Sequence, residues 1–386
     1  MSALAGITVL ELSRVLAGPW CGMQLADLGA EVIKLEPFEG DDTRGLGPPF
    51  LDGISAYFAC CNRNKRSLAI DLRAPAARPL LEALVMRADV LIENYRTGTA
   101  ELLGVGHEQL MALNPKLVYC SISGYGRNGP DALRPGYDYV VQAEAGMMAI
   151  TGPAGGEPSK VGVALADLAT GQNASTAILA ALIQRGHSGR GQRIDVSLFD
   201  TQLSWLVNVG AAALFTGSDA PRYGNAHPSI VPYEAYLASD GAFVLAVASE
   251  KLWKTTCEAL QQPAWIDDAR FSNNAARVLN RRELGAELAT IFATQPAAHW
   301  LDLFHQRGIP AAPINSVRQA LDHPVAKARG MRIELGGLPL VGSPLHLSDS
   351  PVDYRLPPPR LGEHSDAIAA ECGFDGAQLR AQGAIR

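Results

Sequence analysis

The sequence of 386 residues contains little cysteine, and its six cysteines are scattered along the chain. None show the Cys-x-x-Cys spacing of a zinc or redox site, and their density is far below that of a disulfide-rich scaffold. The N-terminal segment lacks the basic region of a signal peptide, and no apolar run approaches the ~18 residues that span a bilayer. We therefore expect a cytoplasmic protein with reduced cysteines and no association with membranes.

An excess of positive charge is also absent. The chain has 33 Lys and Arg against 39 Asp and Glu, a net charge of −6, which argues against a nucleic-acid partner. The eight histidines are scattered without a metal-ligand spacing, so no metal site is predicted. A phosphate-binding GxxxxGK[ST] loop and a GxSxG nucleophile elbow are both missing.

One glycine-rich pattern resembles a nucleotide-binding loop, but no helix pattern follows it. GYGRNG, at Gly124–Gly129, matches GxGxxG directly after a predicted strand. A dinucleotide site requires this loop to open a helix, whereas Pro130 and the residues after it continue as loop. We interpret the glycines as giving backbone freedom to a mobile surface loop.

Strand and helix patterns alternate over the first 125 residues. A strand pattern at Ile7–Leu12 precedes a helix with Pro19 near its start, and the next strand is predicted at Glu31–Glu36. The alternation continues to about residue 123, which predicts an α/β fold with a parallel sheet and helices on its faces. Turn-forming residues at 217–225 predict a domain boundary.

The stretch Val161–Gly171 places a single carboxylate, Asp167, between an apolar strand-like run and a long helix of small residues. The first N–H groups of a helix are unpaired and carry partial positive charge, so an anionic oxygen is stabilised there. Asp is a preferred N-cap residue, and the local pattern favours that role for Asp167 over a chemical one.

Polar residues also follow the predicted strands. Asn94, Tyr95 and Arg96 follow one strand, and Arg44 lies in the loop GDDTRG. Open α/β sheets bind ligands at the carboxyl ends of their strands, and an arginine there suits a pyrophosphate. The alternative for Arg96 is an ordinary solvated side chain.

Several segments together are typical of one family. They are LELSRVLAGPWCGMQLADLGAEVIKLEP, GDDTR, NRNKRSLAIDL, ADVLIENYRTGTAELLG, SGYGRNGP, GYDYVVQAEAGMM, ALADLATG, GRGQRIDVSLFD and PRLGEH. In this order they resemble the class III CoA-transferases, the family of formyl-CoA, oxalate and carnitine CoA-transferases. The resemblance covers nearly the whole chain.

The resemblance implies an activity. Asp167 falls on the family's nucleophile, so the chain is expected to move CoA from an acyl-CoA such as succinyl-CoA to a carboxylic acid. The reaction would pass through an aspartyl anhydride and an aspartyl-CoA thioester. Coenzyme A is then a substrate, with no tightly bound cofactor. The family's CoA-contacting positions correspond to Asn94, Tyr95, Arg96, Leu16, Arg44 and Leu103.

The resemblance also bears on the substrate. Tyr137 and Asp138 match positions that line the family's active site, with ordinary loop structure as the alternative. The related 2-methylacyl-CoA racemases carry His in place of Tyr137, and tyrosine is a poor acid or base at neutral pH. Formyl-CoA transferases have Gln in place of Leu16 and a glycine-rich loop that this chain lacks, so a non-catalytic acyl-CoA-binding paralogue stays open.

The segment GNAHPSIVPY is similar to relatives that use dicarboxylates. In such an enzyme His227 is expected either to meet the acceptor's distal carboxylate or to stabilise a turn. The family architecture implies an interlocked homodimer. Its Rossmann-like large domain would comprise residues 1–216 and 325–386, and a smaller α+β domain would comprise residues 217–324.

Overall fold

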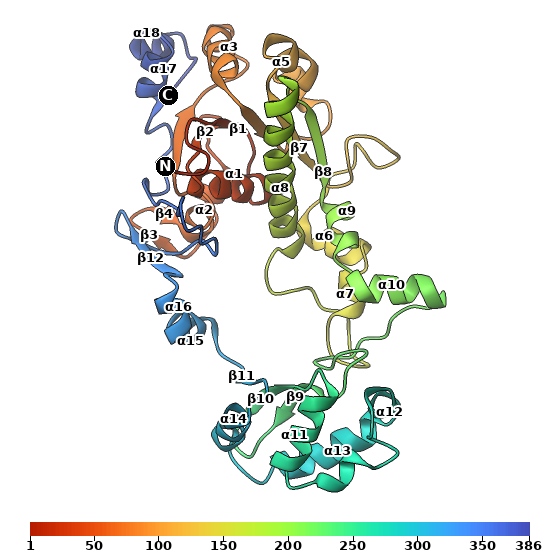
Figure 1. The fold of residues 1–386 in the computed structure, drawn as a ribbon. Coiled ribbons are helices and arrows are strands. Elements are labelled where there is room, and N and C mark those ends of the chain that lie inside the picture. Colours follow the sequence, from red (N-terminus) through yellow and green to blue (C-terminus); the bar gives the residue numbers. More distant parts are fainter. The chain divides into compact units, whose positions relative to one another are not determined.

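A computed structural model describes all residues, 1–386, and the chain forms two compact units (Figure 1). The first comprises Met1–Met147, Lys160–Ser218 and Pro324–Arg386, and the second comprises Met148–Ser159 and Asp219–His323. Residues 148–159, which the sequence places in the large domain, therefore group with the second unit.

Six parallel strands form the sheet of the first unit, which confirms the predicted α/β fold. Along the sheet they are β5 (Lys65–Ala69), β2 (Glu31–Glu36), β1 (Thr8–Glu11), β6 (Val90–Glu93), β7 (Val118–Ser123) and β8 (Arg193–Ser197). After β1 the chain builds one half of the sheet, and β6 begins the other half on the opposite side of β1. The strand order therefore reverses between β1 and β6.

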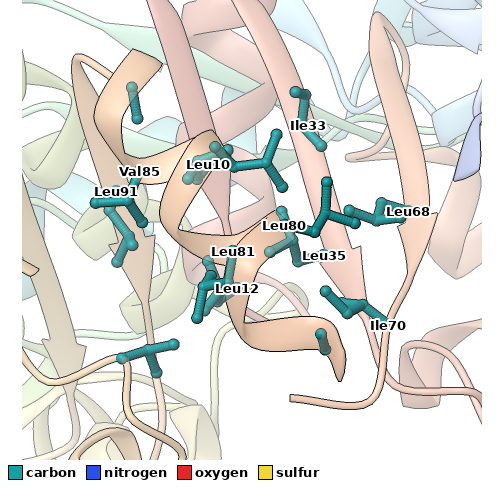
Figure 2. Packing of buried hydrophobic residues seen from close by; sticks show 14 of the residues in the cluster. Leu10, Leu12, Ile33, Leu35, Leu68, Ile70, Leu80, Leu81, Val85 and Leu91 are labelled. Atoms are coloured by element: carbon teal, nitrogen blue, oxygen red, sulfur yellow. The ribbon is translucent and has the colours of Figure 1, made fainter. Parts of the chain in front are cut away.

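Helices cover both faces of this sheet because its strands are apolar on both sides. Successive residues point to opposite faces: Leu10 belongs to the core on one side and Val9 to the core on the other. Figure 2 shows the first core, where Leu80, Leu81 and Val85 of α3 (Arg78–Arg87) lie over leucines and isoleucines of the strands. The second core packs α1 (Ala17–Asp27) and α8 (Leu165–Ser188).

The remaining elements of the first unit are short. Gly104, at φ +70°, separates α4 from α5. These elements are β3 (Phe50–Leu51), β4 (Ile54–Ser55), α2 (Ala56–Ala59), α4 (Thr99–Leu102), α5 (His107–Leu113), α6 (Asp138–Glu144), α9 (Leu198–Ser204), α10 (Val207–Thr216), α16 (Pro324–Ala328), β12 (Arg332–Leu335), β13 (Leu338–Val341), α17 (Ser365–Glu371) and α18 (Gly376–Ala381).

The second unit has an aromatic core. Phe292 packs edge-on against Phe243 at 5.1 Å and Trp300 at 5.2 Å between ring centroids. These rings lie between a three-stranded antiparallel sheet and the surrounding helices. The elements are β9 (Tyr233–Leu237), β10 (Ala242–Ala246), β11 (Ala311–Pro313), α11 (Glu250–Ala259), α12 (Asn274–Leu279), α13 (Arg281–Phe292), α14 (Ala297–Gln306) and α15 (Val317–Leu321). Helix α7 (Met147–Ile150) begins at the last residue before this unit. In the whole chain, no helix has the length and apolar character that crossing a membrane requires.

Candidate active site

A cavity of about 290 Å³ lies at the carboxyl ends of the strands in the first unit. It is lined by residues 14–17 after β1, residues 94–97 after β6, residues 122–124 at the end of β7, residues 132–137, and Asp42, Thr99, Arg127, Asp167 and Leu198. Because β1 and β6 are the strands between which the order reverses, this is the crevice where open α/β sheets bind ligands.

Two strand-end loops are joined across this crevice. The Asn94 side-chain amide donates to the carbonyl oxygen of Arg14 at 2.8 Å, and the Arg14 backbone N–H donates to Asn94 Oδ1 at 2.9 Å. Asn94, expected to contact CoA, therefore holds the segment after β1 against the segment after β6.

The segment after β1 contains a strained residue. Val15 has φ +69°, a conformation that a β-branched residue adopts only when its surroundings impose it, at a cost of about 1–3 kcal/mol. The Asp41 carboxylate accepts the Val15 N–H at 3.2 Å, and the Cys61 thiol donates to the Val15 carbonyl at 3.7 Å. This turn brings Leu16 and Ala17, at the start of α1, into the cavity wall.

A buried ionic network lies beneath this turn. The Lys34 ammonium is 2.9 Å from both Glu11 and Asp41, and Lys65 is 2.7 Å from Glu11. Burial opposes ionisation of Lys34, but the facing carboxylates dominate and raise its pKa. Burial likewise opposes ionisation of Asp41, whose pKa nevertheless falls to about 2 because of Lys34 and hydrogen bonds from Thr43. Lys34 also donates to the Ser13 carbonyl at 2.9 Å, so the network holds the segment that follows β1.

Asp167 is the third residue of α8, which begins at Leu165. Two expectations are therefore wrong: Val161–Ala164 forms no strand, and Asp167 does not cap the helix, because Ala164 occupies the N-cap position without a side-chain hydrogen bond. In the first turn the Asp167 carboxylate still lies near the positive end of the helix.

Asp138 supplies the missing cap from another helix. Its carboxylate accepts the Ala166 N–H at 2.7 Å and a hydrogen bond from the Gln142 amide at 2.8 Å. Gln142 in turn accepts the Val161 N–H at 2.9 Å. The first residue of α6 thus fixes the start of α8, one residue before Asp167.

The Asp167 carboxylate has no hydrogen-bond partner within the protein, and its side chain lines the cavity. Burial, together with the negative charge of Asp138, raises its pKa from 3.8 to about 7. The pKa of Tyr57 is raised to about 12 by burial and by the charge of Asp167, so this phenol is neutral. Asp167 therefore combines an unpaired carboxylate with an ionisation near neutral pH.

Four arginines in the cavity wall differ in their partners. Arg14 is 3.4 Å from Asp42, Arg134 pairs with Glu144, and Arg127 pairs with Glu93 at 2.8 Å. Arg96 is exposed and makes no side-chain hydrogen bond or ion pair, so its guanidinium is available to an anionic ligand.

No group of three or more His, Cys, Asp or Glu is placed to hold a metal ion.

The structure brings together six of the ten residues singled out from the sequence. Leu16, Asn94, Tyr95, Arg96, Tyr137 and Asp167 line the cavity, whereas Arg44, Leu103, Asp138 and His227 do not. Asp138 lies directly behind the wall as the cap of α8.

Three of the residues outside the lining have other contacts. Arg44 donates to Glu36 at 2.7 Å and lies 3.8 Å from the Phe58 ring centroid, so its guanidinium is already engaged. Leu103 packs against the hydrophobic core on the α3 face. His227, in the second unit, accepts the N–H of Ser229 at 3.0 Å, which is the turn-stabilising alternative; a contact with the acceptor stays a prediction.

Sequence reasoning missed Arg127, Val15 and Tyr57. Arg127 lies within GYGRNG, a pattern interpreted only as a mobile loop, and the structure places it in the cavity wall. Val15 and Tyr57 carry no local signal, since the strain of one and the proximity of the other to Asp167 depend on tertiary packing.

Comparisons with known proteins agree on one family. CoA-transferase family III matches residues 4–365. The chain is 43% identical to the succinate–glutarate CoA-transferase of Agrobacterium fabrum over 95% of each chain. It is 41% identical to the succinyl-CoA:glutarate CoA-transferase of Mus musculus, over 96% of this chain and 86% of the mouse protein. The crystal structure of a CAIB/BAIF family protein from Brucella suis aligns with a TM-score of 0.87 at 43% identity, over 96% of this chain and 99% of that chain.

Proposed function

This chain belongs to CoA-transferase family III and transfers CoA between an acyl-CoA and a carboxylic acid, and we propose that Asp167 is the nucleophile of this reaction. The observation that carries the proposal is the unpaired Asp167 carboxylate in the wall of the cavity at the switch point of the sheet. A nucleophile needs a free lone pair, and a carboxylate held by hydrogen bonds would have to break them first.

The covalent chemistry divides one exchange into four displacements. The Asp167 carboxylate attacks the acyl-CoA carbonyl, which forms an acyl-aspartyl anhydride and releases CoA thiolate. The thiolate attacks the aspartyl carbonyl, which forms an enzyme–CoA thioester and releases the donor acid. The acceptor carboxylate then displaces the thiolate as a second mixed anhydride, and the thiolate attacks the acceptor's carbonyl. Acyl-CoA product leaves, and Asp167 returns as a carboxylate.

Arg96 supports the placement of CoA in this cavity. It is the cavity arginine without an intramolecular partner, and it follows β6 at the switch point. The phosphates of CoA are the anionic groups that such an arginine suits. We propose that Arg96 binds these phosphates, with Tyr95 and Leu16 in the adjoining wall.

The acids are proposed to be dicarboxylates of four to six carbons. The support is the similarity of the whole chain to relatives named succinate–glutarate CoA-transferase and succinyl-CoA:glutarate CoA-transferase. For the racemase alternative, the position that needs an acid or base is occupied by Tyr137, whose side chain is 66% exposed.

We further propose that the chain works as an interlocked homodimer. Helix α10 (Val207–Thr216) is apolar yet has no buried residue in the single chain, with Leu214 86% and Phe215 90% exposed. Exposed apolar surfaces of this kind mark protein–protein contacts. Light scattering should therefore give twice the chain mass, and a monomer would contradict the proposal.

Intact-protein mass spectrometry tests the nucleophile. The protein is incubated with succinyl-CoA and no acceptor, and then digested or treated with hydroxylamine. An acyl- or CoA-sized adduct, or a hydroxamate, on the Asp167 peptide is expected, with Asp167→Asn as the control. Turnover of succinyl-CoA and glutarate without any adduct at Asp167 would contradict the mechanism. Binding of CoA without turnover of any acyl-CoA would favour the non-catalytic alternative.

A further inference from the structure

Arg127, in the loop that follows β7, is almost enclosed in the wall of the cavity, with 7% of its side chain exposed. One terminal nitrogen donates to both carboxylate oxygens of Glu93, each at 2.8 Å. The other donates to the Tyr95 carbonyl at 2.6 Å and lies 3.4 Å from the Thr97 hydroxyl. One guanidinium therefore spans the segment that carries Arg96.

The same residue also joins neighbouring strands. Its guanidinium donates to the Ile122 carbonyl of β7 at 3.2 Å, and its backbone N–H donates to the Asp195 carboxylate of β8 at 3.0 Å. Glu93, the last residue of β6, is buried. Arg127 thus links three adjacent strands, β6, β7 and β8, at the edge of the cavity.

The loop around Arg127 is closed on itself. A Cβ on Gly124 would lie 2.6 Å from the Cα of Gly136, so both positions require glycine for the backbones to meet. The Thr97 hydroxyl donates to the Ala132 carbonyl at 2.6 Å, which ties the loop to the segment after β6. The glycines of this loop therefore provide close packing of the wall.

The pairing of Arg127 distinguishes it from Arg96. Both terminal nitrogens of Arg127 donate to protein acceptors, so its guanidinium has little capacity left for a phosphate. Arg96, one residue from the carbonyl that Arg127 holds, has none of its donors occupied. We propose that Arg127, paired with Glu93, is a positioning residue that fixes the loop carrying Arg96 for the CoA phosphates. This inference rests on the proposed role of Arg96.

The first test measures the Kd of free CoA by titration calorimetry. Arg127→Gln is expected to weaken binding roughly tenfold, the low end of the loss seen when a partner that orients a metal ligand is removed. Arg127→Lys keeps the charge but lacks the planar fork, so it should not restore affinity. In steady-state assays the KM for succinyl-CoA should rise while the KM for the acid acceptor stays constant. Full rescue by Arg127→Lys, or an unchanged Kd in Arg127→Gln, would overturn the inference.

Two further variants separate positioning from folding. Glu93→Gln combined with Arg127→Gln leaves no unpaired buried charge, so this double variant is expected to fold and to bind CoA as weakly as Arg127→Gln. Arg185 makes a similar clamp at the other end of β6 and β7, where it pairs with Asp89 at 2.8 Å and contacts the Lys116 carbonyl. Arg185→Gln is therefore a matched control, expected to bind CoA with unchanged Kd. An equal loss of affinity in Arg185→Gln would assign the effect to general destabilisation and overturn the inference.

A double-mutant cycle with Arg96→Ala decides how Arg127 acts. If Arg127 acts through the loop that carries Arg96, the double variant should bind CoA about as weakly as the weaker single variant. Losses that multiply would mean that Arg127 contacts CoA independently, against the inference. If Arg96→Ala binds CoA normally, the proposed role of Arg96 in CoA binding fails. If Arg96→Ala binds CoA weakly but Arg127→Gln binds it normally, Arg96 keeps its role and the positioning role of Arg127 is lost.

Discussion

The two ends of the six-stranded sheet carry polar side chains that differ in how fully they are paired. At the amino end, Asp89 accepts the Thr8 N–H at 2.8 Å and pairs with Arg185. Asn114 donates to the Val85 and Ala88 carbonyls, each at 2.9 Å. These side chains satisfy backbone groups or one another, as buried polar groups usually do.

At the carboxyl end, pairing is selective. Lys34, Asp41 and Glu93 are buried and paired, whereas Asp167 and Arg96 have no intramolecular partner for their charged groups. Val15 also remains strained there. At the carboxyl end, therefore, the paired side chains fix the backbone. The unpaired charged groups of Asp167 and Arg96 are thereby held in defined positions at the cavity. Strain and perturbed ionisation are expected where a protein holds groups for chemistry.

The largest effect should follow from removing the unpaired carboxylate. Asp167→Asn should lower the transfer rate by more than about a thousandfold, as is typical for loss of a covalent nucleophile. CoA binding should persist, because Asp167 does not hold the strand-end loops. Steady-state assays with succinyl-CoA and glutarate, with calorimetry for CoA, measure both. Residual turnover above about a tenth of the wild-type rate would contradict covalent catalysis by Asp167.

The variant Asp167→Asn should make the folded chain more stable, although it slows the transfer. The pKa of Asp167 rises from 3.8 to about 7 in the folded chain, so the native state holds a proton that the unfolded chain releases at lower pH. Native stability from this group is therefore lost as the pH rises from about 4 through 7. Asp167→Asn should melt at a higher temperature than the wild type at pH 8, and the gap should close toward pH 4. The exposed Asp219→Asn is the control for removal of a surface carboxylate.

A second large effect is expected in the buried network under the strained turn. Lys34→Met leaves Glu11 and Asp41 without their shared cation and should reduce the free energy of unfolding by about 3–5 kcal/mol. Guanidinium unfolding measures the loss, with the exposed Lys251→Met as a control. A loss below about 1 kcal/mol would show that the network does not stabilise this end of the sheet.

The pH dependence of the first displacement should report the raised pKa. Formation of the covalent adduct from succinyl-CoA should slow about tenfold per pH unit below the pKa of Asp167, near 7, because only the carboxylate attacks. Asp138→Asn keeps an oxygen for the Ala166 N–H but removes the neighbouring charge, so the pKa of Asp167 should fall. The inflection of the rate profile should then move to lower pH. Rapid-quench mass spectrometry follows the adduct, and an unmoved inflection would mean that burial alone sets this pKa.

How far the sequence predicts this site depends on how far apart along the chain the interacting residues lie. Local patterns correctly predicted the parallel sheet and placed a strand at Glu31–Glu36 with the bounds the structure shows. They also singled out residues 94–96, since these directly follow β6. The start of α8 was wrong because its cap, Asp138, lies 28 residues before Ala166. Arg127 was missed because its partner Glu93 is 34 residues away, and periodicity carries no information on such pairs.

The smallest effect should come from the amino end of the sheet. Arg185 and Asp89 are 17% and 23% exposed, and ion pairs accessible to water contribute about 0–1 kcal/mol. Arg185→Gln should therefore lower the free energy of unfolding by about 1 kcal/mol or less and leave the KM for succinyl-CoA unchanged. Thermal melts and steady-state kinetics measure the two quantities. If the KM rose severalfold, loss of an ion pair far from the cavity would weaken CoA binding, and general destabilisation would then also explain a loss in Arg127→Gln. The separation between a structural end and a catalytic end would then be lost. If only the free energy of unfolding changes, the ion pair at the amino end of the sheet does not affect CoA binding at the carboxyl end. The pairing at each end can then be interpreted independently.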